Sequence, residues 1–243
     1  YNNLKEFGVG LESNVDLGWA LFRPIGQLIS WLLSKMYAII PNYGLVVIVF
    51  AFLIKLLLNP LTVKTFESTR KMQSLAPEIN KIKEKYKNDP QKMSRAQMEL
   101  YKSSGANPMG GCLPMLIQMP ILVSVFSIFR SKIEFRGAPF FGWISDLSVP
   151  DTLVELGGFP INILPVLMGS TMFIQQKMMA APNADANQKT MMYVMNVFFL
   201  FLFYSFPSGL NLYYFVFNLL SIIQQKYLIP NPTTVGAGVT LKK

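Results

Sequence analysis

The sequence of 243 residues predicts an all-α polytopic membrane protein, and three observations support this fold class. Hydrophobic residues make up 51% of the chain and charged residues only 14%, which is less charge than soluble proteins carry. The mean hydropathy is +0.35, and several apolar runs approach the roughly 20 residues that cross a bilayer. Ten of the 22 Lys and Arg residues gather in one polar segment between those runs. Five apolar runs and one basic segment therefore define the expected architecture.

Two residue types limit the chemistry that the chain can perform. The sequence contains no histidine, which excludes His-dependent proteolysis and the usual transition-metal sites. Its single cysteine, Cys112, excludes an intramolecular disulfide and is expected to be a small packing residue. There is no nucleotide-binding GxxxxGK(S/T) motif, so we expect no cofactor, no metal and no enzymatic activity. The first residue is Tyr1 rather than methionine, so we expect the chain to be the core of a longer protein.

Residues 1–18 are polar and predict an exposed extracytoplasmic leader. Residues 19–37 predict an amphipathic helix that lies in the membrane interface. Apolar side chains recur there at spacings of three and four, and polar side chains share another face. The apolar set is Phe22, Ile25, Ile29, Leu32 and Met36, and the polar set is Arg23, Gln27, Ser30 and Ser34. The competing interpretation is a sixth transmembrane helix.

The first predicted span covers residues 42–62 and contains Lys55. A lysine inside a membrane helix costs roughly 2.5–3.5 kcal/mol on the insertion scale, which favours a functional role. Asn59 and Thr62 follow at spacings of four and seven, so the three polar side chains share one face of a helix. This stripe predicts a hydrated face, and the alternative is that Lys55 snorkels to the lipid headgroups.

Residues 63–107 predict a helical hairpin outside the membrane. Two apolar patterns with helical spacing flank a turn at Asn88, Asp89 and Pro90. The segment holds 10 of the 22 basic residues and 5 of the 13 acidic residues, which gives a net charge of +5. Short basic loops stay in the cytoplasm, so this hairpin sets the orientation of the chain. Its expected docking residues are Lys81, Lys83, Lys85, Lys87, Lys92 and Arg95, and the alternative is a merely solvated hairpin.

Four further spans are predicted over residues 109–129, 160–179, 190–206 and 210–228. The first two of these flank an extracytoplasmic loop, residues 130–159, whose expected interfacial anchor is Pro139, Phe140, Phe141 and Trp143. Five spans place the N-terminus outside and the C-terminal tail, residues 229–243, in the cytoplasm. Lysines at the predicted inner ends agree with this orientation: Lys177, Lys189, Lys226, Lys242 and Lys243.

Polar side chains inside the spans predict a hydrated cavity. No span contains Asp or Glu, so Lys55 has no carboxylate partner within them. An ammonium without a partner needs water, which favours a wet cavity over a dry helix core. The last span carries a polar stripe at spacings of three and four: Asn211, Tyr214, Asn218, Ser221 and Gln225. Gln118 is a weaker candidate for the same cavity, and hydrogen bonding between helices is the alternative role of the stripe.

Three motifs resemble the YidC insertases, relatives of the mitochondrial Oxa and chloroplast Albino proteins. They are NPLT at residues 59–62, NPMGGCLPMLIQMPI at residues 107–121, and FPSGL at residues 206–210 with Tyr213, Tyr214, Gln224 and Gln225 after it. The resemblance extends from Trp19 to Leu228, and the middle motif is the most specific. It implies five core helices around a hydrophilic groove that opens to the cytoplasm and to lipid and is closed on the outer side.

The resemblance also implies a role in the bacterial inner membrane. Members of this family help nascent membrane proteins to enter the bilayer, alone or beside the Sec translocon. Their groove usually holds an arginine, and the matching position is Lys55, which keeps the charge but lacks the bidentate fork of a guanidinium. The basic hairpin and residues 182–189 are implied to meet the ribosome or targeting components. Bacterial relatives often carry an extra amino-terminal span and a large periplasmic domain.

We therefore expect a non-enzymatic insertase whose groove hydrates a short polar client segment while Lys55 attracts acidic residues in it. The predicted groove residues are Lys55, Asn59, Thr62, Gln118, Asn211, Tyr214, Asn218, Ser221 and Gln225. No small-molecule substrate is expected. A small-solute transporter or channel is the alternative from another class, and the lack of intramembrane acids disfavours it. A membrane chaperone that assembles helices without inserting them would need the same groove, so the sequence does not distinguish the two.

Overall fold

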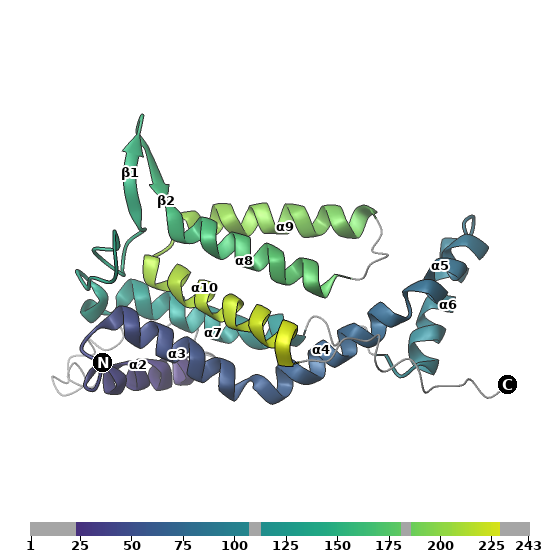
Figure 1. Ribbon diagram of the computed structural model, residues 1–243, viewed down its shortest axis with the longest axis horizontal. Coiled ribbons are helices and arrows are strands. Elements are labelled where there is room, and N and C mark those ends of the chain that lie inside the picture. Colours follow the sequence, from purple (N-terminus) through teal and green to yellow (C-terminus); the bar gives the residue numbers. More distant parts are fainter. Residues whose placement is uncertain (1–22, 107–112, 181–185, 229–243) are drawn as a thin grey trace.

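The computed structural model describes residues 23–106, 113–180 and 186–228, which are mostly helical (Figure 1). The predicted leader, residues 107–112 of the middle motif and the C-terminal tail lie outside these ranges. The α-helices are α2 (Arg23–Tyr37), α3 (Tyr43–Leu57), α4 (Asn59–Ser74), α5 (Ala76–Lys85), α6 (Pro90–Ser103), α7 (Leu113–Ser131), α8 (Ile163–Met179), α9 (Ala186–Tyr204) and α10 (Ser208–Ile223). A 3-10 turn η3 (Ile133–Phe135) follows α7, and a π-helix η4 (Gln224–Leu228) continues α10.

The predicted helical fold class is confirmed, with one addition: strands β1 (Thr152–Leu156) and β2 (Phe159–Asn162) form an antiparallel hairpin that the sequence did not predict.

Helices α3, α7, α8, α9 and α10 lie along the long axis of the molecule, and α2 runs beside α3 and α7 (Figure 1). Helix α10 is central, because it packs against both α8 and α3, whereas α9 packs against α8 at the edge of the bundle. Large apolar side chains of α9 face outward; they are Val194, Val197, Phe198 and Phe201. An apolar outer surface is what a lipid environment stabilises.

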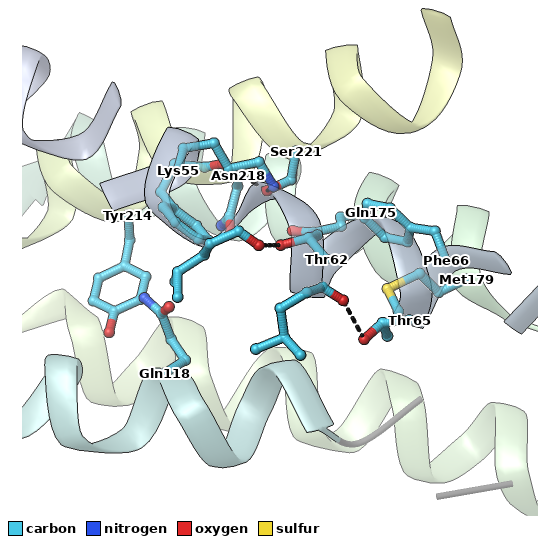
Figure 2. Close-up of a pocket in the computed structure, with 13 residues that line it drawn as sticks. Lys55, Thr62, Thr65, Phe66, Gln118, Gln175, Met179, Tyr214, Asn218 and Ser221 are labelled. Atoms are coloured by element: carbon cyan, nitrogen blue, oxygen red, sulfur yellow. Dashed lines mark hydrogen bonds between the residues drawn. The ribbon is translucent and has the colours of Figure 1, made fainter. Parts of the chain in front are cut away.

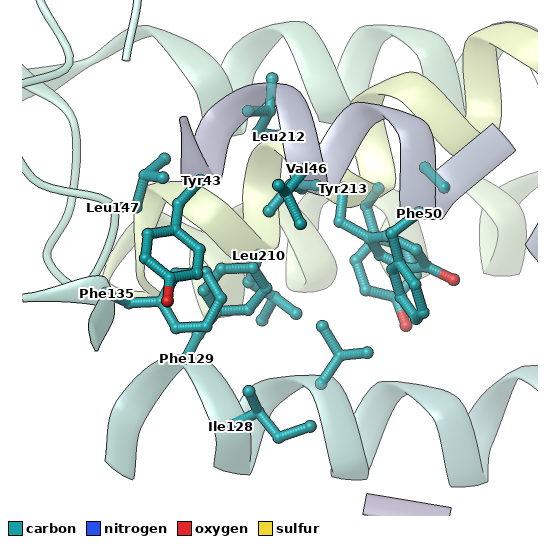
Figure 3. Packing of buried hydrophobic residues seen from close by; sticks show 14 of the residues in the cluster. Tyr43, Val46, Phe50, Ile128, Phe129, Phe135, Leu147, Leu210, Leu212 and Tyr213 are labelled. Carbon is teal, nitrogen blue, oxygen red and sulfur yellow. The ribbon is translucent and has the colours of Figure 1, made fainter. Parts of the chain in front are cut away.

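Aromatic packing closes one end of the bundle (Figure 3). The Phe135 ring lies 4.6 Å from that of Tyr43 and 4.5 Å from that of Phe129, measured between centroids. The loop before β1 covers the turn into α10, where the Gly209 amide donates to the Leu147 carbonyl at 3.0 Å. A Cβ atom at Gly209 would overlap the Phe129 ring, so only glycine permits this approach of α10 to α7.

The predicted interfacial anchor is only partly exposed. Phe141 is exposed, as expected for an anchor. Phe140 instead packs so closely on α3 that a Cβ at Gly44 would overlap its ring. The indole N–H of Trp143 donates to the Asp151 carboxylate at 3.0 Å. These aromatic residues therefore also fasten the loop to the bundle.

Helix α2 has the predicted amphipathic pattern over its described length. Ile29 and Met36 are buried, together with Gly26 and Leu33, which the pattern had not included. The polar face is not simply solvated, because the Lys132 ammonium donates to the Ser34 hydroxyl at 2.6 Å and to the Ser30 carbonyl at 3.3 Å. Burial lowers the pKa of Lys132, and the Glu134 carboxylate opposes this shift. Lys132 thus fixes α2 against the end of α7.

The predicted continuous helix over residues 42–62 is wrong, because the structure divides it at Leu58. Helix α3 ends at Leu57, α4 begins at Asn59, and the two axes differ by 63°. Pro60 explains the break, since it lacks an N–H and is tolerated only in the first turn of the new helix. Within the described ranges, no helix taken alone has the length and apolar composition to cross a membrane, whereas α3 and α4 taken together have both despite their bend.

Helices α5 and α6 form a hairpin that α4 carries away from the bundle (Figure 1). The predicted turn at Asn88, Asp89 and Pro90 separates them. Asp89 caps α6: its carboxylate accepts the Lys92 amide at 3.0 Å and forms an ion pair with the Lys92 ammonium at 3.0 Å. Pro90 follows at the first helical position, where a missing N–H costs nothing.

Replacing Asp89 with Ala is expected to fray the first turn of α6, because the Lys92 amide loses its acceptor. Hydrogen bonds from the Lys92 amide and side chain hold the pKa of Asp89 below its usual value. The cap is therefore complete at neutral pH and is lost as the pH falls through that lowered pKa. Hydrogen exchange of the Lys92 amide measures the effect. In Asp89→Asn, the protection factor of this amide should not depend on pH, because the Asn side chain does not titrate. Equal protection in Asp89→Ala and wild type would contradict the capping role.

Candidate functional site

A cavity of about 150 Å³ lies where α3 bends into α4, between α7, α8 and α10 (Figure 2). Its walls combine apolar and polar side chains from α3, α4, α7, α8 and α10. The lining residues are Lys55, Leu58, Leu61, Thr62, Thr65, Phe66, Gln118, Gln175, Met179, Tyr214, Phe217, Asn218 and Ser221. None of the described side chains of helix α9 belongs to this lining.

The bend places polar groups from two helices around one space. Lys55 lies in the last turn of α3, and Thr62 and Thr65 lie on α4 after the break. The hydroxyls of Thr62 and Thr65 donate to the carbonyls of Leu58 and Leu61 at 2.7 and 3.1 Å (Figure 2). Because each hydroxyl already donates its proton to a backbone carbonyl, it can only accept a hydrogen bond from a group that enters the cavity.

Lys55 supplies the positive charge of the cavity and is 7% exposed. Its ammonium donates to the Ser221 hydroxyl at 2.7 Å, and Ser221 in turn donates to the Phe217 carbonyl at 2.8 Å. The ammonium also lies 5.1 Å from the Phe217 ring centroid and 5.9 Å from that of Phe66. In the described part of the chain, no carboxylate forms an ion pair with Lys55. The charge is held by a neutral hydroxyl and two ring faces, so it is oriented without being neutralised.

Two further polar side chains, Gln118 and Tyr214, line the cavity and lie next to each other (Figure 2). The Gln118 amide nitrogen and the Tyr214 hydroxyl are buried, and neither makes a hydrogen bond within the described ranges. A buried donor without a partner costs about 1–3 kcal/mol. This arrangement favours a cavity that takes up water or another polar group.

Six of the nine predicted groove residues line the cavity: Lys55, Thr62, Gln118, Tyr214, Asn218 and Ser221. The other three join helices, and for Asn211 and Gln225 this is the alternative role predicted for the stripe of the last span. Asn59 follows the bend, accepts a hydrogen bond from Gln224 and is not among the residues that line the cavity. Asn211 donates to the carbonyls of Phe203 and Phe206 at 3.1 and 3.3 Å. Gln225 donates to the Met178 carbonyl at 3.3 Å.

A second set of hydrogen bonds ties α4 to the C-terminal end of α8 beside the cavity. Gln73 donates to the carbonyls of Met178 and Ala180 at 3.2 and 3.0 Å. Arg70 donates to the Gln225 carbonyl of η4 at 3.1 Å. The last carbonyls of a helix have no partner within it, so Gln73 and Gln225 satisfy groups that would otherwise need water.

Sequence reasoning missed several lining residues, chiefly Thr65, Phe66, Gln175 and Phe217. Gln175 had a detectable signal, because it is a polar residue within the predicted span over residues 160–179. Phe66 and Phe217 had none, since an aromatic residue beside a lysine is recognisable only when the two helices are placed together.

The predicted docking residues lie on the α5–α6 hairpin, separated from the cavity by α4. Lys83 is half-buried, and the exposed ones are Lys81, Lys85, Lys87, Lys92 and Arg95. The hairpin therefore presents a positively charged surface.

Known proteins resemble this chain over most of its length. A family model described as 60Kd inner membrane protein matches residues 35–233. A membrane protein insertase YidC from Pelodictyon phaeoclathratiforme is 42% identical over 247 residues, and one from a Geobacter species is 44% identical over 225 residues. These alignments cover 98% and 93% of this chain but 42% and 40% of the relatives. The chain thus spans about two fifths of the length of the curated relatives it matches.

A solved structure also resembles the chain. It is described as an active YidC insertase crystal structure with the first transmembrane domain resolved. The TM-score is 0.66 and the sequence identity 29%, over 85% of this chain and 46% of that one. The overall fold of most of this chain is therefore shared with a solved structure.

Proposed function

The chain belongs to the YidC membrane protein insertase family, and on that premise we propose that its cavity admits polar segments of nascent membrane proteins on their way into the bilayer. One observation carries this proposal: Lys55 is buried in the cavity without a carboxylate partner among the described residues. A buried charge of this kind is costly, so its retention favours a role in attracting an anion. Acidic side chains of a client provide that anion.

We propose a membrane arrangement in which α3 with the start of α4, α7, α8, α9 and α10 form five spans. The α5–α6 hairpin then lies in the cytoplasm and the aromatic end of the bundle lies outside. The exposed apolar side chains of α9 and the positive charge of the hairpin support this orientation. The N-terminus of the chain is then extracytoplasmic and the C-terminus cytoplasmic.

The mechanism needs no covalent step. Moving an unpaired polar group into hydrocarbon costs roughly 2–7 kcal/mol, and the polar lining reduces this cost for a short client segment. The Lys55 charge attracts acidic residues of that segment. The apolar helix of the client then moves into lipid, where burial contributes about 0.8 kcal/mol for each CH₂ group.

We also propose that the basic α5–α6 hairpin docks the ribosome or a targeting receptor, and that the Sec translocon is a further partner. The docking residues are Lys81, Lys83, Lys85, Lys87, Lys92 and Arg95. Their position on a hairpin that stands away from the bundle supports this role, because a large partner can approach it without covering the cavity (Figure 1). Attraction to RNA or to an acidic protein follows from the sign of the charge.

Reconstitution tests the proposed function. Liposomes that contain the purified protein are expected to insert a short single-span client with an acidic leading tail, measured as protection of that tail from external protease. Empty liposomes and liposomes with an unrelated membrane protein provide the background. A tail that stays as accessible as in empty liposomes would contradict insertase activity of this chain.

A further inference from the structure

The β1–β2 hairpin is a well-defined element that the proposed insertion mechanism does not use. Its turn consists of Gly157 and Gly158, with φ angles of +60° and +84°. Two consecutive residues with positive φ are typical of the tight turns that match the twist of a two-stranded hairpin. The strands pair in antiparallel register, so the positions of their side chains are fixed.

The register gives the hairpin one apolar face. Val154 pairs with Ile161 and Leu156 pairs with Phe159, and successive partners on one face are two residues apart. All four side chains are exposed, by 36% to 79%. On the opposite face, Glu155 pairs with Pro160, and the register shifts between Thr152 and Val154, at the exposed Leu153. The charged residue of the hairpin, Glu155, thus lies opposite an apolar face that nothing in the described part of the chain covers.

The hairpin is attached firmly to the end of the bundle. The Asn162 side chain donates to the Tyr204 carbonyl at 2.9 Å, and the Tyr204 hydroxyl donates to the Pro160 carbonyl. From this attachment the strands project sideways, across the direction of α8 and α9 (Figure 1). If the helices cross a membrane, the hairpin runs along its surface.

The helices that adjoin the hairpin also expose apolar side chains. Helix α8 begins at Ile163, directly after β2, and its side chains Val166 and Leu167 are exposed. Phe201, near the end of α9 that contacts β2 through Tyr204, is 81% exposed. The hairpin thus extends the surface that is proposed to face lipid, and it carries no basic residue that would recruit an acidic protein.

We propose that the β1–β2 hairpin lies in the interfacial layer of the phospholipid bilayer, with its apolar face in lipid and Glu155 toward water. This inference depends on the membrane arrangement proposed above but not on insertase activity. An amphipathic element of this kind is buried about 5–10 Å into the boundary between headgroups and acyl chains. The hairpin then fixes the depth of α8 and α9 in the outer leaflet.

Site-specific fluorescence tests the placement. Cys112 is the only cysteine, so a Cys112→Ser background allows single labels. Phe159→Cys reports on the apolar face and Glu155→Cys on the opposite face of the same strand pair. Each variant is labelled with an environment-sensitive dye and reconstituted in phospholipid vesicles. We expect several-fold stronger quenching of the label at 159 by nitroxides placed just below the headgroups, and several-fold stronger quenching of the label at 155 by iodide.

Leu156→Cys repeats the test on the apolar face if labelling at 159 disturbs the protein. Equal iodide quenching at both faces would overturn the proposal, because the hairpin would then stand in water. Protection from iodide without quenching by lipid nitroxides would also overturn it and would indicate a protein contact. The client-insertion assay is run on the same vesicles, so a loss of activity with lipid quenching intact would contradict only the insertase function.

Discussion

Lys55→Glu is expected to reduce insertion of a client with an acidic leading tail by at least about tenfold, since a change of about 1.4 kcal/mol already corresponds to that factor. The substitution replaces attraction by repulsion at the one charged group that lines the described cavity. Unit charges about 4 Å apart interact by roughly 4 kcal/mol at an effective dielectric of about 20, before desolvation is subtracted. The partners that hold the ammonium, Ser221 and Phe217, are arranged for a donor and would not stabilise a carboxylate. Protease protection of the client tail in liposomes measures the result.

Three controls separate the charge from general damage to the protein. Lys55→Arg keeps the charge and is expected to retain most activity. Lys64→Glu makes the same charge change at an exposed position on α4, outside the cavity, and is expected to have little effect. Lys55→Glu should reduce insertion of a client with a neutral tail less than insertion of the client with the acidic tail. Equal losses for the acidic and neutral clients would refute the electrostatic role.

Asp151→Ala is expected to lower the free energy of unfolding by about 3 kcal/mol, because it removes an acceptor shared by three donors. The Asp151 carboxylate accepts the amides of Ile163 and Leu164 at 3.0 and 2.7 Å, together with the Trp143 indole. These amides begin α8, where a negative charge also favours the helix dipole. Asp151 is only 3% exposed, so water cannot readily replace it. Thermal unfolding in detergent measures the loss.

The matched variants make this prediction specific. Asp151→Asn keeps one acceptor oxygen and is expected to cost less than the alanine variant. Glu155→Ala removes an exposed acid from the adjacent strand and should change the unfolding free energy by no more than about 0.5 kcal/mol. An Asp151→Ala protein as stable as the Glu155→Ala protein would show that the three hydrogen bonds are dispensable.

Local patterns in the sequence determined much of this molecule. Apolar runs predicted the bundle helices, and Asn88, Asp89 and Pro90 predicted the turn between α5 and α6. The cost of a lysine in an apolar run singled out Lys55, and helical spacing added Tyr214, Asn218 and Ser221, all of which line the cavity. These features were accessible because periodicity and burial cost depend on residues close together in the chain.

Other features depended on which segments meet in space. Helical spacing placed Asn211 and Gln225 on the same stripe as Ser221. Both side chains nevertheless donate hydrogen bonds to backbone carbonyls outside α10, because each contacts the segment that packs beside its own position along the chain. Asp151 caps a helix that begins twelve residues later, a contact that no local pattern contains. The sequence alone therefore determined which faces are polar and where a charge is costly. Which polar groups share the cavity depends instead on long-range packing, namely on the bend at Leu58 and on the helices packed around it.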